Sequence, residues 1–215
     1  MDANFKLKSK DCGIQDPELA PGWAYFVKED RFQKHLINFI DEPEVCPLIP
    51  LFWSSVPNFS EINTCQAEHD AILRANMRNT RGFNVSGTGL VICTRHALVW
   101  RNGVGDLQKG KQWAEMTFIS MGWFRWHGAR YCNMDYIILS TLVSVAILML
   151  IFSYDISCQW SKNLERQTLQ YPEIMQIDFQ KTNVKAVIPR WHINAHGERC
   201  QTNFSFNYLT GAGEW

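Results

Sequence analysis

The sequence predicts one α/β domain in which some of the strands pair in parallel. Its 215 residues suit a single domain. Hydrophobic residues make up 46% of the chain and charged residues 20%, which is close to the average for globular proteins. Segments typical of strands and of helices alternate along the chain, and this order favours helices that connect parallel strands. No internal repeat or low-complexity tract is visible in the sequence.

The amino-terminal half predicts two strands and two helices. Phe5 and Leu7 alternate with lysines, which is the pattern of a half-buried strand. Residues 31–40 and 64–78 have the apolar spacing of helices. A strand is expected over residues 87–96, and the glycine-rich segment 101–110 is expected to form a turn.

Residues 136–154 contain nineteen residues without a formal charge and allow two interpretations. Their length suits a helix that spans a membrane. However, serines and a threonine interrupt the run, and acidic residues flank it on both sides. We favour a helix over residues 134–144 followed by a buried strand over residues 146–153, because strands covered on both faces are continuously apolar.

The carboxy-terminal third predicts a helix over residues 158–170 and a strand interrupted by Pro189. Asp155 stands between the most hydrophobic predicted strand and this helix. Ligands and metals bind at the carboxyl ends of strands in open α/β sheets, so Asp155 is a candidate site residue. The alternative is that Asp155 only caps the amino terminus of the helix.

Charge and cysteine content restrict the class of protein. Lys plus Arg and Asp plus Glu are equal at 21 each, so net charge gives no support for nucleic-acid binding. The first residues do not have the pattern of a signal peptide, and we expect a protein that is not secreted. Its seven cysteines are then expected to be thiols or metal ligands rather than disulfides.

Histidines and cysteines with zinc-ligand character occur in two sets. Zinc sites commonly use four nitrogen or sulfur ligands that come from close pairs joined by a longer loop. Each set alone is also compatible with buried cysteines and hydrogen-bonded histidines. The prediction of zinc therefore depends on the presence of both sets. The first set is Cys65, Cys93 and His96, and the second is His192, His196 and Cys200.

Several longer strings of residues resemble the KDZ (Kyakuja–Dileera–Zisupton) transposases of fungi. Together they cover most of the chain and include RYCNMDYI, SYDISCQWSKNL and IPRWHINAHGERC. The resemblance implies a ribonuclease-H-like core of mixed strands with flanking helices and an inserted Cys/His segment. It places this insert at residues 64–100 and the best-preserved part of the core at residues 134–200.

The same resemblance implies a DDE-type site in which acidic residues hold Mg²⁺ for cleavage and transfer of transposon-end DNA. Asp2 matches the first acid of the family motif and Asp155 the second. Cys65, Cys93 and His96 match the family's Cys/His insert, which implies zinc. For His192, His196 and Cys200 the resemblance leaves two roles open, metal ligation or support of the active site. The DNA substrate implies a nuclear protein, and further transposase subunits are possible partners.

The chain departs from the family pattern in three ways. The strand expected before Asp2 is absent, and the third acid, a Glu, is expected beyond Trp215, because Glu214 does not match its position. Residues 45–62 and 112–129 interrupt the family pattern and resemble an intron translated in frame. We therefore expect residues 1–215 to be a partial, catalytically inactive remnant of a transposase domain. The alternatives are a metal-containing module that binds DNA or protein, and a small membrane protein with a helix over residues 136–154.

Overall fold

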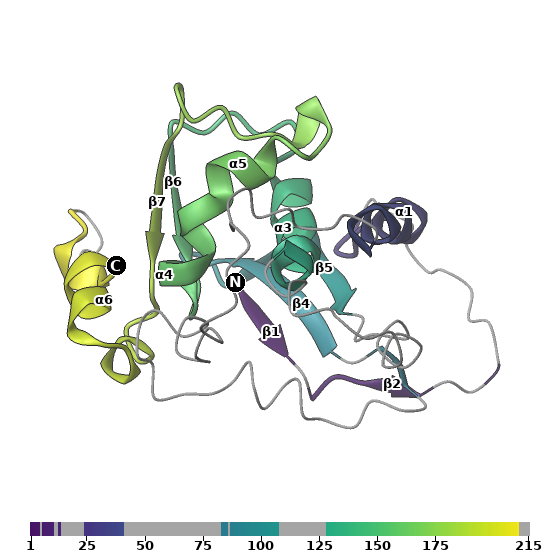
Figure 1. Cartoon of the computed structure of the whole chain (residues 1–215), viewed down its shortest axis with the longest axis horizontal. Helices are drawn as coiled ribbons and strands as arrows, with labels where there is room; N and C mark the ends of the chain where they lie inside the picture. Colours follow the sequence, from purple (N-terminus) through teal and green to yellow (C-terminus); the bar gives the residue numbers. More distant parts are fainter. Residues whose placement is uncertain are drawn as a thin grey trace, which may run out of the picture.

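The computed structural model describes residues 1–4, 6–10, 13, 24–40, 83–85, 87–107 and 128–210. These residues form small β-sheets and short helices in a mixed α/β arrangement (Figure 1). The predicted helix 64–78, Cys65, the insertion 45–62 and most of the insertion 112–129 lie outside them, and Gly128 and Ala129 begin a helix.

An antiparallel sheet contains the strands β1 (Asp2–Asn4), β4 (Gly87–Cys93) and β5 (Leu98–Leu107), in the order β1-β4-β5. Asp2 pairs with Leu90 in this sheet, and β4 and β5 form a hairpin. A separate pair joins β2 (Ser9–Lys10) to β3 (Phe83–Val85). The strand predicted over residues 87–96 is confirmed as β4.

The turn predicted over residues 101–110 is wrong in its larger part, because residues 98–107 form β5. The glycines in this strand serve close packing. A Cβ atom at Gly105 would lie 2.7 Å from Ile137 Cδ1, and one at Gly103 would lie 2.8 Å from the Trp100 carbonyl oxygen. Glycine in a strand often marks such a close approach, which composition alone cannot distinguish from a turn.

Parallel pairing occurs between β6 (Met149–Ser153) and β7 (Asn183–Val187), as the sequence predicts. In this pair Ser153 is the partner of Val187. The amino group of Met1 donates a hydrogen bond to the Ser153 carbonyl oxygen over 2.8 Å. The start of β1 therefore lies beside the carboxyl end of β6.

The uncharged segment 136–154 forms the end of a helix, a turn and a strand. The helix α3 extends over Gly128–Leu142, and β6 begins at Met149. Among the described residues, no helix is both long enough and apolar enough to cross a membrane. The interpretation of this segment as a helix followed by a strand is confirmed. The expected burial of the strand on both faces is wrong, because Met149 and Ile151 are 51% and 40% exposed on one face of β6 while Phe152 is buried.

The core surrounds α3, where Ile137 and Ile138 have no exposed surface and Leu139 has 1%. The helix α1 (Glu29–Ile40) matches the predicted helix and packs against α3 through Phe32, whose ring lies 5.2 Å from that of Tyr136. Figure 1 shows α1 beside α3.

The helix predicted over residues 158–170 is present but divided. It consists of α4 (Ser157–Trp160), the 3-10 turn η2 (Ser161–Asn163) and α5 (Leu164–Thr168). Trp160 is 1% exposed and packs edge-on against Phe152 of β6, with ring centroids 5.1 Å apart. The chain continues through η3 (Glu173–Met175), η4 (Ile193–Ala195), α6 (Glu198–Asn203) and η5 (Phe206–Tyr208).

Asp135 is a buried carboxyl group that joins α3 to α4. It is 3% exposed, and Trp160 Nε1 donates a hydrogen bond to its Oδ1 over 2.6 Å. Burial raises the pKa of Asp135 to about 7, although the bond from Trp160 acts in the opposite direction. The charged carboxylate is therefore disfavoured in the folded protein.

Replacing Asp135 with asparagine is expected to stabilise the protein at pH 8. In wild type the folded state holds more protons than the unfolded state between the unfolded pKa of 3.8 and the folded value of about 7, so stability falls as pH rises through this range. Asparagine carries no charge and keeps an oxygen for Trp160. Relative to wild type, Asp135→Asn is expected to gain about 2–4 kcal/mol more in free energy of unfolding at pH 8 than at pH 4. One pKa unit corresponds to about 1.4 kcal/mol.

The measurement is urea unfolding of both proteins at pH 4 and pH 8. Asp178→Asn is the control, because Asp178 is solvent-exposed and pairs with Lys181, which lowers its pKa. Equal pH dependence in wild type and Asp135→Asn would show that Asp135 has an ordinary pKa.

Candidate acidic and metal-binding sites

Asp155 lies directly beyond the carboxyl end of β6. The preceding residue, Tyr154, still donates its backbone N–H to the Val187 carbonyl oxygen of β7 over 3.0 Å. The Oδ1 atom of Asp155 accepts the backbone N–H of Ile156 over 2.9 Å. The partly buried carboxylate is thus held against the turn that leaves the sheet.

Asp155 is not itself the N-cap residue of α4. That residue is Ile156, whose own side chain makes no capping bond. Asp155 precedes it and binds its backbone N–H, so the carboxylate lies where the chain passes from β6 into α4.

Asp2 is the first residue of β1 and follows directly after Met1. The hydrogen bond from Met1 to Ser153 brings the start of β1 to the end of β6, two residues before Asp155. The backbones of the two predicted acids therefore occupy the same end of the β-structure (Figure 1). The region of the expected third acid and Glu214 lies outside the described residues.

A buried cluster of metal-type ligands contains Cys158, His196 and Cys200. One ligand atom from each lies within 4.8 Å of the others, and the side chains are 2%, 9% and 7% exposed respectively. The distance from Cys158 Sγ to His196 Nδ1 is 3.7 Å.

Three short elements position these ligands. Cys158 belongs to α4, His196 follows η4, and Cys200 belongs to α6. The backbone N–H of Cys200 donates to the Gly197 carbonyl oxygen over 2.8 Å, and Gln201 Nε2 donates to the His196 carbonyl oxygen over 2.6 Å. Buried Ile188 and Ile193 pack with the two cysteines. The ligands are therefore set by local bonds and by a small apolar core.

The chemistry of this cluster fits zinc. Thiolate and imidazole ligands at about 2.0–2.3 Å from a tetrahedral zinc ion lie about 3.5–3.8 Å from one another. The observed separation of 3.7 Å between Cys158 and His196 lies in that range. The cluster supplies three of the four ligands that such a site requires, and its sulfur donors do not suit Mg²⁺.

Cys93 and His96 form a second, smaller pair in the turn between β4 and β5. Cys93 Sγ lies 3.3 Å from His96 Nδ1, and His96 is exposed. Their predicted partner, Cys65, lies outside the described residues. None of the four described cysteines (93, 132, 158 and 200) forms a disulfide, in line with the expected thiols.

A comparison with protein-family models gives a match to the Kyakuja-Dileera-Zisupton (KDZ) transposase over residues 1–127 and 125–215. The chain belongs to the KDZ transposase family. No curated protein and no solved structure matches it. The two parts of the KDZ match meet at residues 125–127, within the predicted insertion 112–129.

The grouping of ligands in this KDZ chain differs from the predicted one. Sequence spacing grouped His192 with His196 and Cys200, whereas the structure brings the latter two to Cys158. The ring of His192 instead lies 4.6 Å from that of Trp191. Cys158 is in the string SYDISCQWSKNL, but it stands 38 residues from His196, and only the fold brings such distant ligands together.

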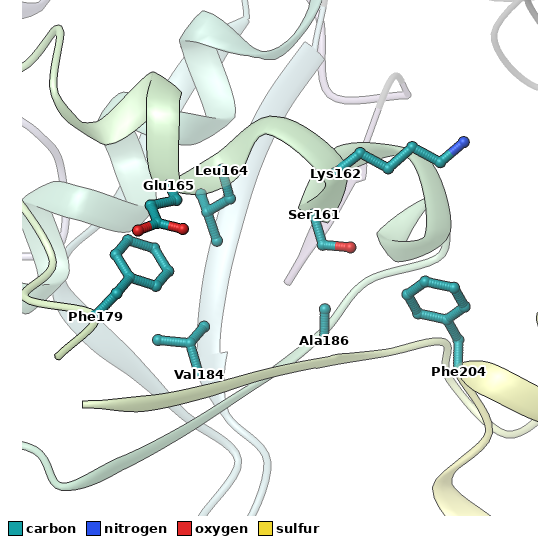
Figure 2. Close-up of a pocket in the computed structure, with 8 residues that line it drawn as sticks. All are labelled: Ser161, Lys162, Leu164, Glu165, Phe179, Val184, Ala186 and Phe204. Carbon is teal, nitrogen blue, oxygen red and sulfur yellow. The ribbon is translucent and has the colours of Figure 1, made fainter. Parts of the chain in front are cut away.

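None of the candidate acids or metal ligands lines the shallow hollow beside the buried cluster, although one of its lining residues, Phe204, packs against the core that contains Cys158 and Cys200. The hollow has a volume of about 270 Å³ and lies between the α4–α5 segment and β7, with Phe179 and Phe204 at opposite ends and Val184 and Ala186 between them (Figure 2). Lys162 and Glu165 extend from the helical side. Since Glu165 is the only carboxylate that lines it, this hollow does not have the acidic character of a phosphoryl-transfer site.

Zinc content tests the buried cluster. We expect purified wild-type protein to hold a zinc ion that Cys158→Ser and Cys200→Ser lose, since each variant removes one of three ligands. Elemental analysis gives the metal content per chain. Cys132→Ser is the matched control, because Cys132 is equally buried at 5% exposure but does not belong to the cluster.

An equal zinc content in wild type and both cluster variants would contradict the assignment. Cys93→Ser distinguishes the second pair: if that pair also binds zinc, this variant loses a further ion while the cluster stays loaded.

Proposed function

We propose that this chain is derived from the catalytic core of a DDE-type transposase, with Asp2 and Asp155 as its remaining metal-binding acids. The observation that supports the proposal is the hydrogen bond from Met1 to Ser153, because it brings the backbone that precedes Asp2 to the end of β6, two residues before Asp155. Membership of the KDZ family supports a transposase-related function.

The strand arrangement supports a ribonuclease-H-like core. The antiparallel strands β5, β4 and β1 follow one another in one sheet, and β6 and β7 form a parallel pair. The Met1–Ser153 bond joins the start of β1 to the end of β6, so the two sheets lie side by side as β5-β4-β1 and β6-β7. Antiparallel and parallel pairs together suit the mixed sheet that the resemblance implies.

The two carboxylates suit Mg²⁺, which prefers oxygen ligands. When bound in such a site, Mg²⁺ stabilises charge on the phosphate oxygens during displacement. Asp155 is oriented for this role by the N–H of Ile156, and the pairing of β6 with β7 fixes where its backbone begins. The backbone position of Asp2 is set by its pairing with Leu90 in the antiparallel sheet.

The 215-residue polypeptide is expected to bind Mg²⁺ without completing strand transfer. A DDE site uses three acids, and only two positions of this sequence match the family motif. Removing one carboxylate from a metal site weakens the electrostatic stabilisation of the transition state, which is usually the largest contribution to catalysis.

Mg²⁺ binding by calorimetry tests the acidic pair. Asp155→Asn is expected to weaken Mg²⁺ binding at least tenfold, since it removes one of two charged ligands. Asp178→Asn, which changes an exposed aspartate elsewhere, is expected to bind as wild type does. Unchanged Mg²⁺ binding in Asp155→Asn would reject the acid assignment.

A strand-transfer assay with a transposon-end duplex tests the expected inactivity. No product is expected from wild type in the presence of Mg²⁺. If wild type forms a strand-transfer product and Asp155→Asn does not, the prediction of inactivity is wrong. Asp155 would then still be assigned as a catalytic acid.

The two insertions can be tested in the transcript. If residues 45–62 and 112–129 come from retained introns, sequencing of spliced RNA across both positions will show transcripts without the corresponding nucleotides. Transcripts that uniformly contain both segments would contradict the intron origin. The flanking segments that encode β4 and α3 provide the internal control, because they are expected in every transcript.

A second candidate function is a metal-containing module that binds DNA or other transposase subunits. The buried cluster of Cys158, His196 and Cys200 favours it, since such a site stabilises a fold without any catalytic acid. A zinc-loaded protein that binds DNA but not Mg²⁺ would favour this module over the acidic site. Because transposases act on chromosomal DNA, membership of the KDZ family supports a location in the nucleus.

A further inference from the structure

Trp191 is exposed to an unusual degree for the largest apolar side chain. It is 81% exposed in the segment that follows β7. A tryptophan has a large aromatic face that contributes strongly to binding when another molecule covers it, and the indole of Trp191 offers that face to solvent.

The backbone around Trp191 is fixed on both sides. Ile188 is fully buried and Ile193 is 7% exposed. Between them, the Pro189 carbonyl oxygen accepts the backbone N–H groups of His192 and Ile193 over 2.9 and 3.1 Å. The ring of His192 lies 4.6 Å from the indole at an interplanar angle of 49°. Trp191 is therefore held outward by a tight turn and flanked by a second ring.

The neighbours of Trp191 are polar and cationic. Arg190, Asn194 and Arg199 are exposed in the same segment, together with one carboxylate, that of Glu198. The exposed residues next to Trp191 in the described sequence are thus polar or charged, whereas a surface for protein docking is typically formed by several apolar side chains. An aromatic ring next to an arginine instead suits a nucleotide, whose base stacks on the ring while its phosphate pairs with the cation.

This turn lies beyond the same edge of the sheet as Asp155. The strands β6 and β7 end together, with Ser153 opposite Val187. Asp155 follows Ser153 by two residues, and Trp191 follows Val187 by four. The buried ligands His196 and Cys200 lie directly after the turn and connect it to α4 through Cys158. Asp155 and the turn of Trp191 therefore both follow the carboxyl end of the β6–β7 pair.

We infer that Trp191 is a stacking site for an unpaired base of DNA, with Arg190 as the accompanying phosphate contact. This inference rests on the proposed function, because it assigns a substrate contact to the edge that carries Asp155. The ligand class is single-stranded DNA, in which the faces of the bases are accessible.

The test is fluorescence anisotropy with a labelled oligothymidine of about 15 nucleotides at low salt, where weak phosphate contacts are retained. Trp191→Ala is expected to weaken binding about tenfold, since base stacking is worth about 1–3 kcal/mol. Trp191→Phe keeps an aromatic ring and is expected to lose less. Binding of the corresponding duplex is expected to change little, because its bases are stacked internally.

Tyr208→Ala is the matched control, because Tyr208 is an aromatic residue with 74% exposure in the same carboxy-terminal region. Trp191 is exposed, so its variants are expected to keep the unfolding midpoint and zinc content of wild type. Binding of oligothymidine that is undetectable in wild type, or equal in wild type and Trp191→Ala, overturns the inference. An equal loss in Tyr208→Ala also overturns it, because the effect would then not be specific to Trp191.

Failure of this inference is distinguishable from failure of the acidic site. Trp191→Ala is expected to lose affinity for oligothymidine and to bind Mg²⁺ as wild type does. A protein that binds Mg²⁺ through Asp155 but shows no effect of Trp191→Ala keeps the acidic site and loses only the stacking contact.

Discussion

The packing of α3 is the constraint on which most of the structure depends. Three consecutive residues of this helix contact three different parts of the fold. Asp135 accepts the indole N–H of Trp160 in α4, and Tyr136 packs against Phe32 of α1. Ile137 lies against the antiparallel sheet so closely that a Cβ at Gly89 or Gly105 would come within 2.8 Å of its Cδ1 atom. Close-packed interiors tolerate little change in volume, so this contact fixes the distance between helix and sheet.

The position of α4 has a direct consequence for the candidate sites. Trp160 is held by Asp135 and by the ring of Phe152, so the short helix cannot move away from β6 without losing both contacts. Asp155 precedes this helix and Cys158 lies within it. The same buried contacts therefore help to position both Asp155, after the carboxyl end of β6, and the sulfur ligand Cys158 in α4. Zinc at Cys158, His196 and Cys200 would add a connection between this helix and the turn that carries Trp191.

The sequence predicted the local elements where one physical signal dominated. The apolar spacing of residues 31–40 predicted α1, and the continuous apolar run before Asp155 predicted β6 and its parallel pairing. The turn predicted from the glycines in residues 101–107 was wrong. Glycine favours a turn because of its conformational freedom, but it is also required where a helix approaches a strand closely. Only the identity of the opposing side chain, Ile137, separates these two causes, and that residue lies more than thirty positions further along the chain.

Motifs in the sequence alone determined the KDZ family, and the apolar run predicted a helix followed by a strand within residues 136–154. The sequence also led us to propose Asp155 as an acid at the end of that strand. The tertiary structure decided which ligands belong together. His196 and Cys200 were expected with His192, but they meet Cys158 from α4, while His192 lies against Trp191. Regular spacing places residues on one face only when they belong to one continuous helix. Here η4 and α6 are separate short elements, so the ligand set follows from how they pack on α4 rather than from the number of residues between them.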